Sequence, residues 1–244
     1  LHTDLNPLGI YPPESGLTIG PTKTAVVGSL GGTIDVGTLG ALVYSVPIEI
    51  PAGINGMQPN LAVTYNSQAG NGLLCWGWDL EGSSCITRTG QTLYHDGKMT
   101  AADLSTKDRF LLDGQRLITV KSTYGVPEYR TENDAMMRIS RIGDWFKVQD
   151  KNGNVLEYGS TQNSRLWDEE SKTAICWMIR SITDPYGNSV SYQYDKNDET
   201  GEIKILSIEY TINEGQGIDA QFRVNFKYST RDNTDFSYLG NRIL

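Results

Sequence analysis

The residue types that perform most nucleophilic and acid–base catalysis are scarce in this sequence. A Ser-His-Asp or Cys-His arrangement needs a histidine held beside the nucleophile, and the only histidines are His2 and His95. His2 stands next to the first residue, and His95 precedes Asp96-Gly97, where polar residues are typical of a turn. We therefore expect no catalytic residues and no enzymatic activity.

Patterns that would bind a metal ion are equally weak. No pair of cysteines or histidines has the spacing of zinc ligands. The segment "DKNGN" offers Asp150, Asn152 and Asn154 at alternate positions of a calcium loop, but the twelfth position is Thr161, which cannot chelate as an acidic residue does. We interpret this segment as a capped turn. We interpret "DKNDETGE" (195–202) as a solvated loop, with weak calcium binding as the alternative, and expect no metal site.

Two features could instead contact a sugar. The acidic run 168–170 lies beside Trp167, and glycoside hydrolysis needs a pair of carboxylates. Trp76 and Trp78 flank one glycine, so strand alternation would place both rings on one face, either as a buried pair or as a sugar-stacking platform. We favour an exposed loop anchored by Trp167 and a buried aromatic pair.

Charge and composition exclude several classes of partner. The 244 residues include 21 Lys or Arg and 29 Asp or Glu, a net charge of −8. Nucleic acid is therefore not an expected partner, because phosphate binding needs clustered positive charge. No apolar run approaches the ~18 residues of a membrane span. The glycine segments 28–32 and 70–72 lack the context of a phosphate loop, so no cofactor is expected.

The three cysteines leave the redox compartment open. Cys75, Cys85 and Cys176 are an odd number, which is not typical of a disulfide framework. Cys75 and Cys85 could pair on neighbouring strands in an oxidising compartment. The alternative is that all three are small buried residues.

The elements that would position these side chains are mostly strands. The segments 60–66 ("NLAVTYN") and 221–228 ("QFRVNFKY") alternate apolar and polar residues, as a strand with one packed and one wet face requires. In "IKILSIEYTI" (203–212) the same rule predicts one packed face, formed by Leu206, Ile208, Tyr210 and Ile212. Helical periodicity is scarce, and "AADLSTKD" (101–108) predicts at most a turn or two. The sequence predicts an all-β protein of antiparallel hairpins and meanders that form open sheets.

Aspartate-glycine pairs mark two of the expected hairpins. "RFLLDGQRLITV" places Asp113 and Gly114 between two apolar runs, which is the strongest local hairpin signal because both central positions of a type I′ turn need positive φ. "LYHDGKMT" repeats the pattern at Asp96-Gly97. We predict a hairpin at each place.

A repeat links two further hairpins, "DKNGNVLEY" and "DPYGNSVSY". Four positions match: Asp150 with Asp184, Gly153 with Gly187, Asn154 with Asn188, and Tyr158 with Tyr192. In each unit the aspartate would cap the turn, the glycine would take a conformation that other residues resist, and the outgoing strand would carry tyrosine to the packed face.

The second of these units resembles a known repeat, and an earlier stretch resembles a known family. "WMIRSITDPYGNSVSYQYD" (177–195) looks like the YD-repeat hairpin of Rhs-type proteins. "YSVPIEIPAGINGMQPNLAVTYNSQAGNGLLCWGW" (44–78), followed by "SSCITR" and "DRFLLDGQRLI", resembles the amino-terminal region of the SpvB-like virulence-plasmid B proteins and of the B components of Tc insecticidal toxin complexes. Cys75 and Cys85 depart from the family, where small residues such as Gly or Ser are expected.

The resemblance implies a structural function. In Tc B components this region contributes strands to a hollow shell, built jointly with an Rhs-repeat (C-like) chain, that encloses a toxic segment. The expected partners are then the rest of a longer polypeptide, an Rhs-repeat chain and its cargo, and the expected location is secreted or at the cell surface. The alternative is a cell-surface module that binds glycans or proteins through exposed Trp and Tyr.

On this interpretation the important side chains form turns or pack strands. The turn residues are Asp113, Gly114, Asp150, Gly153, Asn154, Asp184, Gly187 and Asn188. The packing or sugar-stacking residues are Tyr65, Trp76, Trp78, Tyr158, Trp167 and Tyr192.

The chain is expected to have three parts. Residues 1–40 would form an extended Gly/Pro-rich arm with one short strand, "TKTAVV" (22–27). Residues 41–135 would form the SpvB-like β region, and 136–244 a region of YD-like hairpins that continues from it. The chain is expected to be the first segment of a longer polypeptide.

Overall fold

The computed structural model describes residues 2–7, 31–37, 40–70, 72, 74–123, 125–198, 200–229, 238–239 and 242–243. The strand predicted at 22–27 lies outside these residues. All pairings between the named strands are antiparallel, so the predicted all-β antiparallel class is confirmed. The two divisions expected at 40/41 and 135/136 stay predictions; strands on either side of residue 135 pair with each other.

Eight strands close into a barrel, which differs from the open sheets that the sequence predicts. In order around the barrel they are β6 (Cys85–Thr89), β7 (Arg109–Leu112), β8 (Gln115–Thr123), β9 (Val126–Thr131), β10 (Arg138–Ile142), β11 (Trp145–Gln149), β12 (Val155–Tyr158) and β14 (Thr173–Thr183). The ring closes because Trp177 of β14 pairs with Ile86 of β6. Because the ring is closed, each of its eight strands has a neighbouring strand on both sides.

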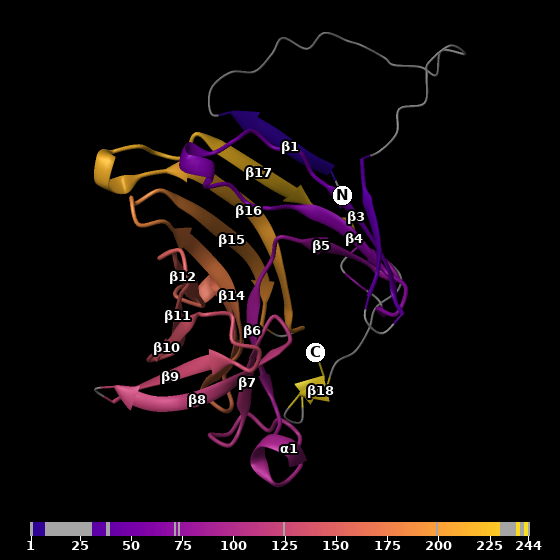
Figure 1. Cartoon of the computed structure of the whole chain (residues 1–244), viewed down its shortest axis with the longest axis vertical. Coiled ribbons are helices and arrows are strands. Elements are labelled where there is room, and N and C mark those ends of the chain that lie inside the picture. The colour runs from indigo at the N-terminus through magenta and orange to yellow at the C-terminus, as the bar shows by residue number, and fades with distance from the viewer. Residues whose placement is uncertain are drawn as a thin grey trace.

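A second part of the sheet is open and begins at β14. It continues through β15 (Ser189–Asn197), β16 (Glu202–Ile212), β17 (Phe222–Lys227) and β1 (His2–Pro7), and it curves above the barrel in Figure 1. β13 (Arg165–Asp168) also pairs with β14. The two edges of β14 bond to different barrel strands. On one edge Ile179 N–H donates to Ser84 O, next to β6, and on the other Met178 O accepts from Gly159 N, next to β12.

A separate four-stranded sheet consists of β2 (Thr33–Val36), β3 (Leu42–Pro47), β4 (Ala62–Asn66) and β5 (Trp78–Glu81), at the right of Figure 1. β18 (Tyr238–Leu239) and β19 (Arg242–Ile243) form a short hairpin. The helices described are short: α1 (Leu93–Asp96) and the 3-10 turns η1 (Ile54–Gly56), η2 (Gln162–Ser164) and η3 (Glu214–Gln216). No helix that the structure describes is long and apolar enough to cross a membrane.

One hydrophobic core runs through the barrel and along the open sheet. An aromatic cluster of Phe110, Tyr129, Phe146 and Trp177 brings together β7, β9, β11 and β14, with ring centroids 5.0 to 6.1 Å apart. Val190, Ile208 and Val224 continue the core across β15, β16 and β17. The core therefore joins the two parts of the sheet rather than filling each separately.

Alternation predicts β17 correctly but fails in β16. Val224 and Phe226 are buried, as expected. In β16, however, Leu206 is 52% exposed and Ile205 only 3%. The pairing with β15 skips Leu206, and an extra residue of this kind, a β-bulge, reverses which side chains face inward. Ile208 and Tyr210, beyond the bulge, are buried as predicted.

The hairpin predicted at Asp96-Gly97 is wrong. Residues 93–96 form α1, which Thr92 caps by accepting a hydrogen bond from His95 N, and Gly97 ends it at φ 68°. The Asp96 carboxylate binds Arg109 and Arg116 instead of turning a hairpin. The segment 101–108 forms bends and a turn rather than a helix.

Candidate functional site

The hairpin at Asp113 and Gly114 is present and is bonded to two distant strands. It joins β7 to β8, with φ of 47° at Asp113 and 80° at Gly114. The Asp113 carboxylate accepts from Cys85 N at 2.8 Å and from Ser84 Oγ at 2.6 Å. Ser84 Oγ also lies 2.9 Å from the hydroxyl of Tyr158 in β12. Ser84 therefore connects the turn to the tyrosine of the first repeat unit.

The groups around Ser84 are held in their neutral forms. Burial raises the pKa of Tyr158 above its ordinary value, although the Ser84 hydrogen bond opposes this. Burial, followed by the charge of Asp113, raises the pKa of Cys85 to about 12. The half-buried thiol and the buried phenol therefore add no charge beside the Asp113 carboxylate, which accepts hydrogen bonds from Ser84 and Cys85.

Replacing Ser84 with alanine is expected to lower the free energy of unfolding by about 1–2 kcal/mol, because it removes the shared hydroxyl and leaves a buried phenol without that partner. Urea unfolding followed by circular dichroism measures the change. The neighbouring Ser83 is exposed, so Ser83→Ala is the matched control and is expected to change stability by less than about 0.5 kcal/mol. Equal effects of the two changes would contradict the role of Ser84.

The two repeat units build the same turn. In each, one oxygen of the aspartate, Asp150 or Asp184, accepts from the backbone N–H groups two and four residues further on, at 2.8 to 2.9 Å. The other oxygen accepts from the side-chain amide of Asn154 or Asn188, at 2.8 Å in both. Gly153 and Gly187 take φ of 83° and 86°, a region that disfavours other residues.

The second turn differs from the first by being buried between other segments. Asn55, in the loop between β3 and β4, donates to Asp184 Oδ2 at 3.2 Å. Asn213, between β16 and β17, donates to Asn188 Oδ1 at 3.0 Å. Asp184, Asn188 and Asn213 are all buried. Burial raises the pKa of Asp184, but the hydrogen bonds from Asn188, Asn55 and Tyr186 outweigh it and lower the pKa below its ordinary value.

The predicted aromatic residues occupy three different settings. Tyr158 and Tyr192 are buried in the main core. Trp78 and Tyr65 are half-buried and pack together on the four-stranded sheet, with centroids 5.2 Å apart. Trp167 is half-buried, with the Arg165 guanidinium 5.5 Å from its ring.

Trp76 does not pair with Trp78 on one face. Gly77 takes φ of 76°, and Cys75 bridges to Trp78, so the chain turns sharply between the two tryptophans. Strand alternation does not apply across such a turn. Trp76 is 70% exposed, in contrast to the buried pair that the sequence predicts.

The acidic run, the cysteines and His95 have ordinary structural contacts. Asp168 accepts from Ser171, and Glu169 pairs with Lys172 at 2.7 Å. His95 lies 3.1 Å from Glu132. All three cysteines are free thiols. In the described part of the chain, no group of three His, Cys, Asp or Glu residues could hold a metal ion.

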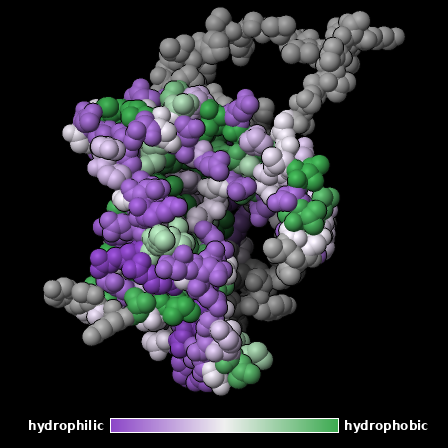
Figure 2. All heavy atoms as spheres, viewed as in Figure 1, coloured by the Kyte–Doolittle hydropathy of each residue, from purple (hydrophilic) through white to green (hydrophobic). Residues whose placement is uncertain are grey.

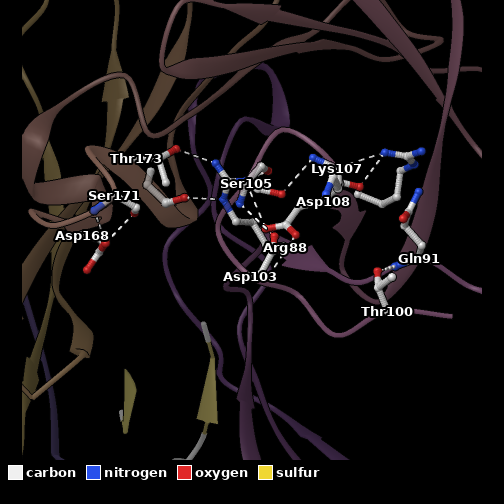
Figure 3. A network of polar contacts seen from close by, with 12 residues as sticks. Arg88, Gln91, Thr100, Asp103, Ser105, Lys107, Asp108, Asp168, Ser171 and Thr173 are labelled. Atoms are coloured by element: carbon white, nitrogen blue, oxygen red, sulfur yellow. Dashed lines mark hydrogen bonds and ion pairs between the residues drawn. The ribbon is translucent and has the colours of Figure 1, made fainter. Parts of the chain in front are cut away.

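Sequence reasoning missed a polar cluster at one end of the barrel (Figure 3). Arg88 is buried and donates to Ala174 O at 2.7 Å, Thr173 Oγ1 at 2.5 Å and Asp108 Oδ2 at 3.3 Å. Burial lowers the pKa of Arg88 and raises that of Asp108. The signal was available: in "CITRT" alternation places Arg88 on the same face as buried Ile86.

This cluster lines a cavity of about 620 Å³. The barrel strands β6, β7, β8, β9, β10 and β14 contribute side chains, together with the segments 104–108 and 171–172. We call it the barrel-mouth cavity. Arginines, hydroxyl groups and aromatic rings line it, so the arrangement can bind a polar or anionic group.

A known protein family matches most of the chain. The family described as Salmonella virulence plasmid 65kDa B protein, SpvB, matches residues 36–239. No curated protein matches the sequence significantly.

Several solved structures share the fold. The crystal structure of TcdB2-TccC3 without its hypervariable C-terminal region aligns with a TM-score of 0.66 at 19% identity, over 88% of this chain and 12% of that chain. The Photorhabdus luminescens Tc holotoxin pore aligns with a TM-score of 0.59 at 20% identity, over 75% and 10%. The N-terminal domain of the effector protein SpvB from Salmonella typhimurium strain LT2 aligns with a TM-score of 0.52 at 20% identity, over 68% and 63%. This chain thus spans about a tenth of the Tc chains that it matches.

Proposed function

Since the chain belongs to the SpvB family of Salmonella virulence plasmid 65kDa B proteins, we propose that it is a non-catalytic structural segment of a secreted or cell-surface toxin-related protein. It supplies β-sheet wall to a hollow shell that encloses a toxic cargo and helps to deliver it. The observation that carries this proposal is the fold shared with TcdB2-TccC3 over 88% of the chain.

The architecture supports a role as wall. The barrel and the open sheet belong to one 13-stranded sheet, so these two parts are continuous with each other, and a separate four-stranded sheet accompanies them. Hydrogen bonds pair its strands, and the carboxylates of Asp150 and Asp184 fix its two repeat turns. A wall needs this kind of rigidity, because an enclosed cargo must not displace the strands around it.

The proposed partners follow from the same comparison. They are the remainder of a longer polypeptide, an Rhs-repeat chain of the TccC3 type, and the cargo of that chain. Within the segment, we assign residues 1–40 to an arm, 41–135 to the SpvB-like region and 136–244 to the YD-like hairpins.

The predicted turn and packing residues take structural roles in this proposal. Asp150 and Asp184 fix their turns through their carboxylates, and the Asp113 carboxylate ties its turn to Ser84 and Cys85. Tyr158 and Tyr192 bury the faces of the strands that leave the two repeat turns. No group among them is assigned a chemical step.

The test is to image the full native polypeptide by negative-stain electron microscopy, co-expressed with an Rhs-repeat chain of the TccC3 type. A closed hollow particle is expected. The same polypeptide expressed without the Rhs-repeat chain is the control, and it should not close, because the shell is built jointly. Separate solid β modules in the co-expressed sample would contradict the proposal.

One observation favours a second candidate, a surface module that binds glycans or proteins. Ile34, Val36, Leu42 and Trp76 are exposed on or beside the four-stranded sheet, and Figure 2 shows hydrophobic residues gathered over it. Because aliphatic residues dominate the group, a protein contact fits it better than a sugar. If the protein binds a glycan array and Trp76→Ala abolishes this binding, glycan binding would become the favoured function.

A further inference from the structure

We propose that the barrel-mouth cavity is a binding site for a carboxylate group, with Arg141 and Tyr129 as the residues that contact it. This goes beyond the proposed wall function and does not depend on it. The ligand is a small carboxylic acid or an acidic side chain of a polypeptide. A cavity of about 620 Å³ has the size of a small-molecule site.

Arg141 supplies the first reason, because its charge has no acidic partner. It lies on β10 and lines the cavity. Its Nε donates to Gly143 O at 3.2 Å, but no carboxylate pairs with it among the residues that the structure describes. Its two Nη atoms carry four N–H donors, and no acceptor for them lies within the described part of the chain. A carboxylate is the group that accepts two such donors in parallel.

Aromatic rings hold the Arg141 guanidinium in place. Its central carbon lies 5.4 Å from the centroid of Phe110, 5.9 Å from Phe146 and 6.0 Å from Trp177. Cation–π contacts of this kind restrain a guanidinium without using its N–H donors. The donors are therefore both positioned and available, which reduces the ordering cost of binding an anion.

Tyr129 supplies a second, independent reason. Its side chain lines the cavity and is 8% exposed, and its hydroxyl makes no hydrogen bond to the described residues but is not among the fully buried side-chain atoms. The hydroxyl is therefore accessible, and it can donate a hydrogen bond to a group bound in the cavity. Burial raises the pKa of Tyr129, while the charges of Arg141 and Arg109 oppose the rise, so the hydroxyl stays a donor beside positive charge.

The charges around the cavity favour an anion, and a singly charged one. Arg88, Arg109, Arg141 and Lys172 line it, against the single acid Asp108. Asp108 pairs with Arg88, Arg109 with Asp96, and Lys172 with Glu169, which leaves Arg141 in excess. The whole chain has a net charge of −8, so this excess of positive charge is confined to the cavity. One unpaired arginine beside a carboxylate matches a monoanion better than a phosphate dianion.

The test is an NMR titration of the isotope-labelled chain with N-acetylglutamate amide, which carries one carboxylate, followed at Arg141 Nε and Trp177 Nε1. We expect saturable shifts with a dissociation constant on the order of 1 mM, the range for a ligand of that size. The neutral N-acetylglutamine amide should cause no saturable shift. A capped hexapeptide with one central glutamate forms a second arm: tighter binding of the peptide identifies a polypeptide as the source, and tighter binding of the small acid identifies a metabolite.

Three variants separate a site from a general charge effect. Arg141→Gln should weaken binding at least about tenfold, Tyr129→Phe several-fold, and Arg141→Lys should retain part of the affinity. Arg165→Gln is the matched control, because Arg165 also stacks on a tryptophan but lies outside the cavity lining. If Arg141→Gln does not fold, the affinities of Tyr129→Phe and Arg141→Lys still test the proposal.

Three results would overturn the proposal. They are unchanged binding in Tyr129→Phe and Arg141→Lys together, equal binding of the neutral amide, and absence of any saturable shift at Arg141. Tighter binding of inorganic phosphate than of the carboxylate would overturn the assignment of the ligand class.

Discussion

Replacing Trp177 with alanine is expected to lower the free energy of unfolding by about 4 kcal/mol, as removal of a large aromatic from a packed core does. Trp177 is 0% exposed, and its ring centroid lies 5.0 Å from that of Phe146 and 5.5 Å from that of Phe110. Its Nε1 donates to Asp144 O at 2.7 Å, so the change also removes a hydrogen bond. Because Trp177 pairs with Ile86 at the junction that closes the barrel, the loss falls on the closure itself.

Urea unfolding followed by far-ultraviolet circular dichroism measures this loss. Trp76→Ala is the matched control, since Trp76 is 70% exposed, and it should change the free energy of unfolding by less than about 0.5 kcal/mol. A loss of less than about 1 kcal/mol in Trp177→Ala would contradict the packing that we describe.

The second large effect is expected at the buried repeat turn. Asp184→Ala should lower the free energy of unfolding by about 3 kcal/mol, because it leaves the donors of Asn188 and Asn55 without their charged acceptor. Asp150→Ala removes the same local bonds from the more exposed turn, so about 1 kcal/mol is expected. The same urea experiment compares the two. A larger loss at Asp150 would contradict the role assigned to the contacts with Asn55 and Asn213.

The contribution of Asp184 should also depend on pH. Its folded-state pKa lies below the ordinary value of about 3.9. A depressed pKa means that the stabilisation is fully present above the unfolded-state pKa and is lost as the pH falls through the folded-state pKa. The difference in melting temperature between wild type and Asp184→Ala should therefore be constant from pH 7 to about pH 5 and shrink towards pH 3. A difference that grows on acidification would contradict this.

Turns that depend on a few neighbouring residues could be predicted from the sequence. The turn at Asp113-Gly114 follows from the need for positive φ at both positions. The repeat predicts two equivalent turns, and Asp150 and Asp184 make equivalent hydrogen bonds. Asp96-Gly97 has the same two letters as the first turn, but there Thr92 caps a helix and two arginines bind the aspartate. A dipeptide therefore predicts a hairpin only where strands are free to pair on both sides.

Features that depend on distant pairing could not be predicted. The pairing of Ile86 with Trp177 closes the barrel, yet nothing local in either strand specifies the partner. The bulge at Leu206 reverses the inward face of β16, and it arises from the register with β15 rather than from the composition of the segment. Arg141 was missed because an arginine in an alternating strand suggests a solvent-facing side chain, whereas here it rests on three aromatic rings.

The sharing of β14 has a mechanical consequence. One edge of β14 pairs with β6 around residues 176–178 and with β15 further along, at 181–183. The opposite edge pairs with β12. Separating the barrel from the open sheet therefore requires breaking the pairs that β15 makes with β14 at residues 181–183, where β12 holds the other edge. Among the described strands, β14 is thus the one element that takes part in both the barrel and the open sheet, and a change that displaces it would disturb both parts at once.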